Sequence, residues 1–405
     1  MTGLVGIDFG TTNSVVSILR PNGSLTTLDP FRTLLCFWSE EDRKGASLHH
    51  AAGPSAIESY LEDPLSSRLI MSMKSYLAQR SFTQTQIFGK AFTLEALVAL
   101  FLRALLGEDY AGYKVVAGRP VRFAGDFAED DLGEARLRQS FSQAGFPEIE
   151  VALEPEAAGY RFAQTLDGPA TVLVGDFGGG TSDFSVIRFD QRVTPLGYAG
   201  VGIAGDMFDY RIIDHVVSPL LGKHDTYISM GNKLPVPPDY FAGFARWHKL
   251  SLMRMPRILR DIAAVAATST HPERLRTLIR LIEHEVGYQL YQAVSTVKAE
   301  LSRSETATLR FAHEDFVIEQ PIARTDFDKW IAPDLKRFEG AVDEALKRAG
   351  LGSDAIDRVF LTGGTSFVPA VRRLFEQRFG AGKVSGGGEF VSVAEGLALI
   401  GRDKS

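Results

Sequence analysis

The fold is decided by the stretch Val174-Gly175-Asp176-Phe177-Gly178-Gly179-Gly180-Thr181-Ser182-Asp183. An apolar run leads into it, which is typical of a buried strand, so Asp176 is expected at the end of that strand. Three consecutive glycines permit left-handed backbone conformations and let N–H groups approach a ligand, which can form an anion-binding nest. Asp176 and Asp183 offer carboxylate oxygens to a hard cation such as Mg²⁺ on a phosphate. The alternative interpretation is a glycine-rich hairpin turn with solvated acids.

A second copy of this pattern occurs near the N-terminus, in Gly6-Ile7-Asp8-Phe9-Gly10-Thr11-Thr12-Asn13-Ser14. Asp-Phe-Gly recurs, and each copy is followed by a strand, a turn and a second strand, at 15–19 and 25–28 and again at 184–189 and 192–196. The first turn contains Asn-Gly, a strong hairpin signal. The repeat indicates an internal duplication. Two such halves facing each other could hold a polyphosphate from both sides, with the acids placing a metal between them.

Composition excludes several classes of function. The chain has 405 residues, a net charge of −6 and a single cysteine, Cys36, so no disulfide can form within the chain. Proteins that bind nucleic acid usually have a basic domain, which argues against such a partner. The first residues lack the features of a secretory signal, and the apolar stretch 94–106 is too short to span a bilayer. We therefore expect a cytoplasmic protein with neither a membrane nor a nucleic-acid partner.

The motif set resembles the ATPase domain of the seventy-kilodalton heat-shock chaperones, the DnaK family, and is most like its bacterial YegD-type members, which have little beyond this domain. The resemblance covers essentially the whole chain. It implies an α/β, duplicated actin-like (ribonuclease-H-like) ATPase fold, with two lobes of two subdomains each around a central nucleotide cleft. The expected boundaries are 1–170 for lobe I (core 1–29 and 113–170, inserted small subdomain 30–112, with the closing helix 390–402 packing back on it) and 171–389 for lobe II (core 171–206 and about 326–389, inserted helical subdomain 207–325).

The resemblance implies ATP or ADP and Mg²⁺ as cofactors. Asp8, Asp176 and Asp183 would hold the metal, largely through water. Gly205 and Asp206 would open a helix whose N-terminal N–H groups face phosphate. The phosphates would be cradled by the two loops, through Gly10, Thr11, Thr12, Asn13, Gly178, Gly179, Gly180 and Thr181.

The predicted catalytic residues are Lys74, Glu154, Asp176 and Thr181. The family has a lysine at the position of Lys74 that positions the attacking water; without the resemblance, Lys74 would be interpreted as a surface lysine. Glu154 precedes Pro155 and is therefore expected in an extended conformation. The matching glutamate in the family lies by the water shell of the metal and couples hydrolysis to domain motion, whereas the alternative is an acid at a helix start.

The adenosine is expected on two elements. The range 272–302 has apolar residues at helical spacing and is predicted to be one long helix, which carries Lys298 and Ser302 on one face. After a later apolar strand, the family's backbone approaches adenosine at the positions of Gly363, Gly364 and Thr365.

Base recognition departs from the family pattern. Ser295 replaces a glutamate, and the two arginines that sandwich adenine are replaced by Ala299 and Phe367. Losing two cation–π contacts would cost ~1–4 kcal/mol, because each is worth ~0.5–2 kcal/mol. Stacking of Phe367 on the base, worth ~1–3 kcal/mol, would restore part of this. We expect ATP binding that is weaker than in the chaperones, or less selective for the base.

The first functional hypothesis is an ATP-binding, chaperone-like protein with weak Mg²⁺-dependent hydrolysis and without a peptide-binding domain, because few residues follow the closing helix. The second is a nucleotide-gated binding scaffold without significant turnover. A small-molecule kinase and an actin-like filament rank lower. The sequence identifies no protein partner.

Three further stretches are interpreted from composition. The range 222–245 is expected to be loop-like because of its prolines. The basic range 246–261 is expected to be a solvated helix face, with a partner surface or an anion site as the alternative. His49-His50 is expected in a surface loop, with half of a metal site as the alternative.

Overall fold

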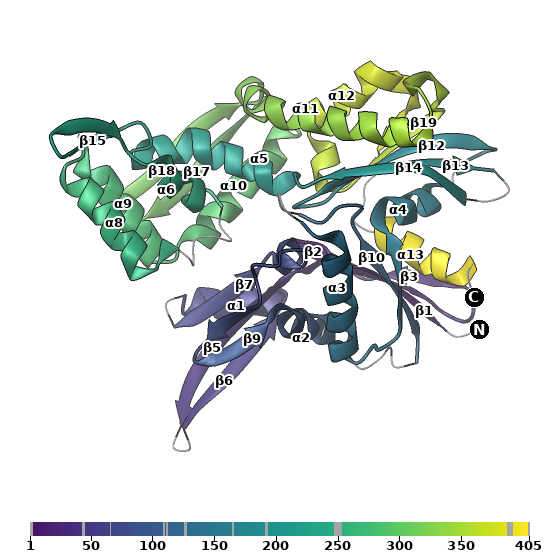
Figure 1. Ribbon diagram of the computed structural model, residues 1–405, viewed down its shortest axis with the longest axis horizontal. Helices are drawn as coiled ribbons and strands as arrows, with labels where there is room; N and C mark the ends of the chain where they lie inside the picture. The colour runs from purple at the N-terminus through teal and green to yellow at the C-terminus, as the bar shows by residue number, and fades with distance from the viewer. Residues whose placement is uncertain are drawn as a thin grey trace. The chain divides into compact units, whose positions relative to one another are not determined.

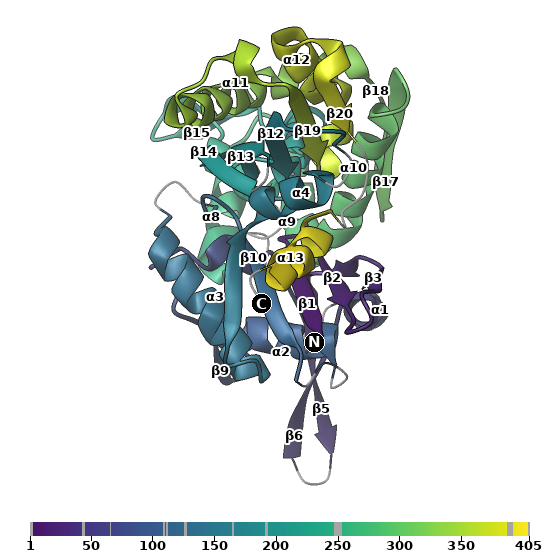
Figure 2. The same cartoon turned by 90° about the vertical axis from the view of Figure 1, so that its right-hand side faces the viewer.

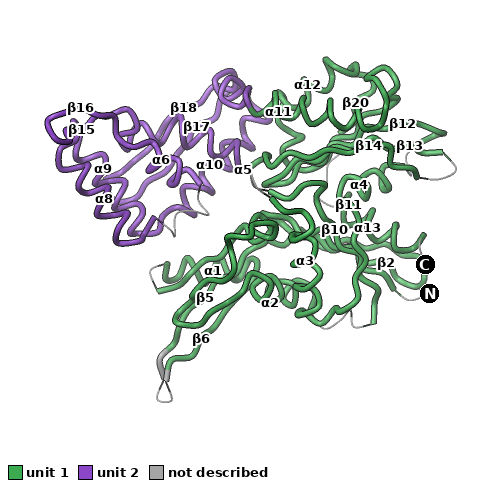
Figure 3. Tube along the Cα trace, in the orientation of Figure 1, with its two compact units in different colours: residues 1–205, 334–405 green, residues 206–333 purple. Residues whose placement is uncertain are grey.

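The chain forms two compact units, which are described separately. A computed structural model describes residues 3–42, 45–64, 66–107, 110, 112–124, 128–163, 166–190, 193–246, 253–386 and 392–403 (Figure 1). Unit 1 comprises residues 1–205 and 334–405, and unit 2 comprises residues 206–333 (Figure 3). Because helices accompany several sheets, the predicted mixed α/β class is confirmed.

The first large sheet of unit 1 has the strand order β11-β10-β1-β2-β3, with β4 pairing β2. β1 pairs antiparallel with β2 and parallel with β10, so Asp8 lies at the carboxyl end of a central strand. The bounds are Leu4–Asp8 for β1, Asn13–Leu19 for β2, Leu25–Thr27 for β3, Phe31–Arg32 for β4, Lys114–Arg119 for β10 and Ile149–Leu153 for β11.

The second large sheet has the order β14-β13-β12-β19-β20. β12 pairs antiparallel with β13 and parallel with β19, so this sheet has the same order of strand directions as the first. Asp176 and Asp183 are direct partners across β12 and β13. The bounds are Ala170–Phe177 for β12, Ser182–Phe189 for β13, Val193–Val201 for β14, Arg358–Thr362 for β19 and Val384–Gly386 for β20.

Two helices lie between these sheets, α4 (Glu154–Ala163) and α13 (Ser392–Asp403) (Figures 1 and 2). α4 packs on β12 and β13, and α13 packs on β1, β2 and β10. Small residues let the backbones meet: a Cβ at Gly396 would lie 1.7 Å from the carbonyl oxygen of Ala157. The ion pair of Arg161 with Glu395 joins the two helices at their surface.

Replacing Gly396 with alanine is expected to destabilise unit 1 by more than ~3 kcal/mol, because the added methyl meets backbone that cannot move aside like a flexible side chain. Urea denaturation of the variant measures this loss. Gly340→Ala is the matched control, since a Cβ there meets no atom within 4 Å and alanine raises helix propensity. Equal midpoints for the two variants would contradict the close packing of α13 on α4.

The outer faces of the two sheets are covered by further helices. On the first sheet, Val5, Ile7 and Phe9 form one core with α2 and α3. On the second sheet, the ring of Phe177 packs on Phe338 of α11 at a centroid distance of 5.3 Å, and on α12 as well. These helices are α2 (Leu94–Leu106), α3 (Asp130–Ala144), α11 (Arg324–Ala349) and α12 (Pro369–Phe379).

The remainder of unit 1 is a small three-stranded sheet, β6-β5-β7, with a helix and a hairpin. The expected surface loop at His49-His50 is wrong: both residues lie in β6, where the ring of His50 stacks on Phe37. β7 leads into the short 3₁₀ helix Met73–Tyr76, which carries Lys74. The bounds are Leu34–Asp42 for β5, Gly45–Ala52 for β6, Pro54–Glu62 for α1, Ser67–Met71 for β7, Gln84–Ile87 for β8 and Lys90–Thr93 for β9.

Unit 2 corrects two expectations. The range 222–245 contains two paired strands and a helix, because its prolines lie at strand and helix ends. The range 272–302 is two helices, because Glu285 takes a left-handed conformation with φ 53° between them. The bounds are Gly205–Ile212 for α5, Thr226–Ser229 for β15, Asn232–Pro235 for β16, Pro238–Phe244 for α6, Pro256–Ala267 for α8, Pro272–Glu283 for α9, Gly287–Leu301 for α10, Thr306–His313 for β17 and Phe316–Ala323 for β18.

Some expectations fall partly outside the described residues, namely 247–252 of the basic range and 390–391 of the closing helix. Among the described helices, none combines the length and the hydropathy that crossing a membrane requires. The division of the chain into two lobes at residue 170 stays a prediction.

Candidate functional site

The interior of unit 1 holds a cluster of five ionisable side chains. Asp8 ends β1, Asp176 is the penultimate residue of β12, and Asp183 lies in β13. Lys74 and Glu154, which come from the 3₁₀ helix and the start of α4, are 7% and 4% exposed. Such burial is costly for charged groups unless they are paired or bind a metal. The structure thus brings together five of the six residues that the sequence assigned to the metal and to catalysis, and the sixth, Thr181, lies beside them.

Lys74 and Glu154 form a buried ion pair, with 2.5 Å between Nζ and Oε1. Burial by itself would lower the pKa of Lys74, but the negative charges of Glu154, Asp8 and Asp176 outweigh it and raise the pKa above its usual value. The ammonium therefore stays charged, and its positive charge acts on all three aspartates.

The three aspartates have raised pKa values. Burial, followed by the charge of Glu154, raises the pKa of Asp8 to about 7. The same two causes raise the pKa of Asp183 to about 8, and burial with the charges of Glu154, Asp8 and Asp183 raises that of Asp176 well above its usual value. One ammonium does not balance four carboxylates in so small a volume. An oxygen-only donor set with excess negative charge suits Mg²⁺, which would relieve this repulsion.

Asp183 is fixed by backbone groups. Its Oδ1 accepts hydrogen bonds from the N–H of Val121 at 2.8 Å and of Arg122 at 3.3 Å, and the hydroxyl of Thr181 also bonds its carboxylate. A Cβ at Gly200 would lie 2.4 Å from the same oxygen, so the neighbouring strand has room for no side chain there. The carboxylate orientation therefore depends on the segment that follows β10.

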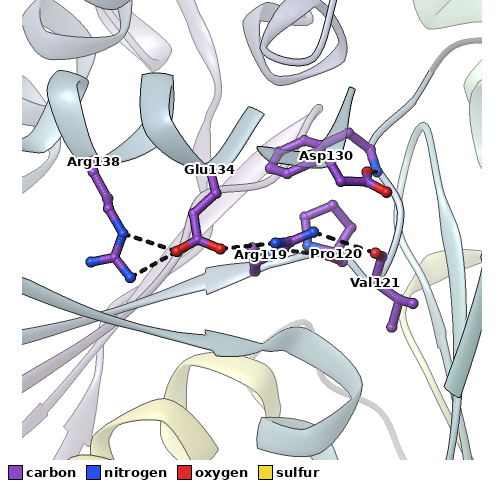
Figure 4. Close-up of polar contacts among 7 residues, drawn as sticks. Arg119, Pro120, Val121, Asp130, Glu134 and Arg138 are labelled. Atoms are coloured by element: carbon purple, nitrogen blue, oxygen red, sulfur yellow. Dashed lines mark hydrogen bonds and ion pairs between the residues drawn. The ribbon is translucent and has the colours of Figure 1, made fainter. Parts of the chain in front are cut away.

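A polar network holds that segment in place (Figure 4). The guanidinium of Arg119 donates to the carbonyl oxygens of Pro120 at 3.0 Å and Val121 at 3.4 Å, and to Glu134 at 2.8 Å. Glu134 also accepts from Arg138 of the same helix. Arg119 and Glu134 were not predicted from the sequence, where the available signal was an arginine before a proline at the end of a strand.

The two glycine loops are neighbours. A Cβ at Gly180 would lie 3.2 Å from Oγ1 of Thr11 and 3.4 Å from Oγ of Ser75, the residue after Lys74. The first loop is tight, since a Cβ at Gly10 would lie 2.0 Å from the carbonyl oxygen of Asn13. The second is closed by a hydrogen bond of 2.9 Å from the N–H of Gly178 to the carbonyl oxygen of Thr181. Thr12 and Gly179, partly buried, belong to the same two loops.

The Gly363-Gly364 motif approaches the second glycine loop, residues 178–181. Gly363 has φ 86°, and a Cβ there would lie 2.1 Å from the carbonyl oxygen of Phe177, so only glycine fits. Gly364 and Thr365 continue into a short 3₁₀ helix that ends at Phe367, whose ring is 53% exposed. The N–H of Gly205 also contacts this loop, at 3.5 Å from the carbonyl oxygen of Gly178.

Three predicted nucleotide residues belong to unit 2. Asp206 lies in the first turn of α5. Nζ of Lys298, in α10, lies 2.7 Å from Oδ2 of Asp209, a residue that is 1% exposed. The hydroxyl of Ser302 donates a hydrogen bond to the carbonyl oxygen of Lys298. Asp209 was not predicted from the sequence as the partner of Lys298. The ion pair holds the ammonium on the face that was expected to contact ribose.

A cavity of about 650 Å³ adjoins the backbone donors to Asp183 and lies between β14, α11 and the segment after β10. Val121, Arg122 and Gly200 line it, but the predicted nucleotide residues do not. We place the candidate site at the ionisable cluster instead, because perturbed pKa values beside glycine loops indicate chemistry more directly than volume does.

Residues 281–402 match the family model described as Hsp70 protein. The match covers less than a third of the chain and runs from the end of α9 through α13. It supports an Hsp70-related, actin-like ATPase, with ATP or ADP and Mg²⁺ as the cofactors of that family and a chaperone-like function. The ionisable cluster lies outside the matched residues, so the geometry of unit 1 is independent support.

Proposed function

We propose that this protein binds ATP with Mg²⁺ and hydrolyses it slowly, as a chaperone-like ATPase of the Hsp70 type and closest to the YegD-like members. The observation that carries the proposal is the convergence of Asp8, Asp176, Asp183, Lys74 and Glu154 beside two neighbouring glycine loops. Buried carboxylates suit a metal, and glycine loops suit phosphate. The shared strand order of the two large sheets supports a duplicated, two-lobed fold.

Each residue has a physical role in this proposal. Asp8, Asp176 and Asp183 would hold Mg²⁺, largely through water, and Mg²⁺ would neutralise charge on the phosphates. The loops at 10–13 and 178–181 would direct N–H and hydroxyl donors at the phosphate oxygens. Lys74, oriented by Glu154, would position the attacking water, and Glu154 would sense the γ-phosphate. Catalysis of phosphoryl transfer would then consist of positioning and electrostatic stabilisation.

The residues at the two expected base-contacting positions support weak binding of ATP. Ala299 offers no cation to an adenine ring, whereas the exposed ring of Phe367 is available for stacking. Gly205, Gly363, Gly364 and Thr365 would bring backbone to the nucleoside. Lys298 and Ser302 would contact the ribose once the ammonium leaves Asp209 or bridges to it.

The experiment that tests this proposal is calorimetric titration of ATP with Mg²⁺ into the chain and into Gly180→Val. The valine would fill the space beside Thr11 and Ser75, so we expect affinity to fall by at least ~10-fold, or ~1.4 kcal/mol. Gly168→Val is the matched control, since a Cβ there meets no atom within 4 Å. No heat with the parent chain, or equal affinity for the two variants, would overturn the proposal.

A nucleotide-gated scaffold is the second candidate, favoured by one observation. Lys74 is already bound to Glu154 at 2.5 Å and is 7% exposed, an arrangement that also suits a structural ion pair without turnover. Single-turnover measurement separates the two: bound ATP recovered unchanged after hours favours the scaffold. The small-molecule kinase, the filament and the cytoplasmic location stay predictions.

A further inference from the structure

Unit 2 contains a second cluster of titratable groups, and none of its residues was assigned to the nucleotide. His284 follows the last residue of α9, His313 ends β17, and Glu314 begins the turn into β18. One potential ligand atom from each of the three side chains lies within 4.8 Å of the other two. Two imidazoles and a carboxylate are a frequent protein ligand set for Zn²⁺.

The geometry of the cluster is close to that of a metal site. His284 Nδ1 lies 2.8 Å from His313 Nε2 and 3.5 Å from Glu314 Oε1. Bonds of ~2.0–2.2 Å to a tetrahedral zinc ion put neighbouring ligand atoms ~3.3–3.5 Å apart. The histidine–carboxylate pair already has this spacing, and the two ring nitrogens need to separate by only about half an ångström. The ring planes stand at 76° to each other.

The backbone and a neighbouring arginine orient the carboxylate. Glu314 has φ 51°, a left-handed conformation that is usual in a two-residue hairpin turn such as Glu314-Asp315, between the paired residues His313 and Phe316. Arg280 Nη1 lies 3.4 Å from Glu314 Oε2 and 2.8 Å from Asp315 Oδ1. One carboxylate oxygen thus faces the arginine, while the other faces His284. Ligating carboxylates commonly have such an outer partner.

Solvent reaches the cluster. The side chains of His284 and Glu314 are 38% and 48% exposed, which gives an ion a route from water and leaves room for a water as the fourth ligand. Nitrogen ligands distinguish this cluster from the all-carboxylate group in unit 1. They favour Zn²⁺ and neighbouring transition metals, whereas Mg²⁺ prefers oxygen.

We propose that His284, His313 and Glu314 bind one Zn²⁺ ion, with water as the fourth ligand. The ion would cross-link the end of α9 to the tip of the β17–β18 hairpin. These two parts of unit 2 are 29 residues apart in the sequence. Zn²⁺ binding to the folded state would stabilise that state by mass action, so the bound ion would raise the melting temperature of unit 2. An ordinary hydrogen-bonded histidine pair beside an exposed acid is the alternative that the experiment must separate.

The test is a Co²⁺ titration of the full metal-free chain, with excess Mg²⁺ present to occupy the carboxylate cluster. We expect visible absorption bands of a four-coordinate site that saturate at one Co²⁺ per chain and disappear when Zn²⁺ is added. His284→Ala and His313→Ala should abolish the bands, and Arg280→Met should weaken binding by ~10- to 100-fold, as loss of an outer partner does. His50→Ala, in β6, is the matched control and should bind as the parent does.

A separate variant distinguishes the loss of a metal ligand from a loss of folding. Glu314→Asn removes the carboxylate but suits a left-handed backbone, so the metal-free variant should melt no lower than the parent while losing at least ~10-fold in Co²⁺ affinity. Bands that persist in His284→Ala, or no bands with the parent chain, would overturn the proposal.

Discussion

Replacing Lys74 with methionine is expected to lower ATP turnover by ~100- to 1,000-fold, the usual cost of one preorganised charge in an active site. Methionine keeps most of the apolar stem and removes only the ammonium. The proposed phosphate and metal contacts remain, so the affinity for ATP with Mg²⁺ should change by less than ~10-fold, or ~1.4 kcal/mol. Single-turnover hydrolysis and calorimetry on the same preparation separate the two effects.

The buried partner of Lys74 requires a second variant. Removing the ammonium leaves the Glu154 carboxylate buried without its ion-pair partner. The loss of one partner of a buried ion pair typically costs ~3–5 kcal/mol of stability. Lys74→Met combined with Glu154→Gln removes that charge, and it should recover most of the stability but none of the turnover. Lys90→Met, on the exposed side of β9, is the control for a lost surface lysine. Parent-level turnover in Lys74→Met would exclude its catalytic assignment.

Replacing Asp183 with asparagine is expected to stabilise the metal-free protein at alkaline pH. The folded-state pKa of Asp183 is raised from 3.8 to about 8, so the folded protein retains a proton that the unfolded chain has released. Stability from this group is therefore complete below pH ~4 and is lost as the pH rises towards ~8. The variant avoids this loss, which is worth up to ~6 kcal/mol at 1.36 kcal/mol per unit of pKa. Asparagine can still accept the N–H groups of Val121 and Arg122.

Urea denaturation at pH 4 and at pH 9, without metal, measures this effect. The gain over the parent should be near zero at the lower pH and largest at the higher pH. Adding Mg²⁺ at pH 9 should stabilise the parent more than the variant, since the cation replaces the proton. Asp354→Asn, at an exposed position, controls for the loss of one negative charge. A gain that does not depend on pH would contradict the raised pKa.

The sequence predicted well those features that neighbouring residues produce. Apolar runs on each side of an Asp-Phe-Gly loop gave hairpins that the structure contains, because strands and tight turns depend on the local apolar pattern and on glycine. The same reliance on periodicity produced an error at 272–302. α9 and α10 both present apolar residues at helical spacing, and the only local sign of the break at Glu285 is Gly287, which begins α10 two residues later.

What the sequence by itself determined was therefore the two acid-bearing loops and their strands. Only the tertiary structure decided which distant residues complete them. Lys74 meets Glu154 across 80 residues, and Asp183 takes its N–H donors from a segment 62 residues away. Such contacts arise when helices and sheets pack. The position of Arg119 before a proline marks the end of a strand, but it does not identify Glu134 as the partner of the guanidinium. The cluster of His284, His313 and Glu314 could not be predicted from the sequence either, because the hairpin and the helix end that carry it meet only in the folded chain.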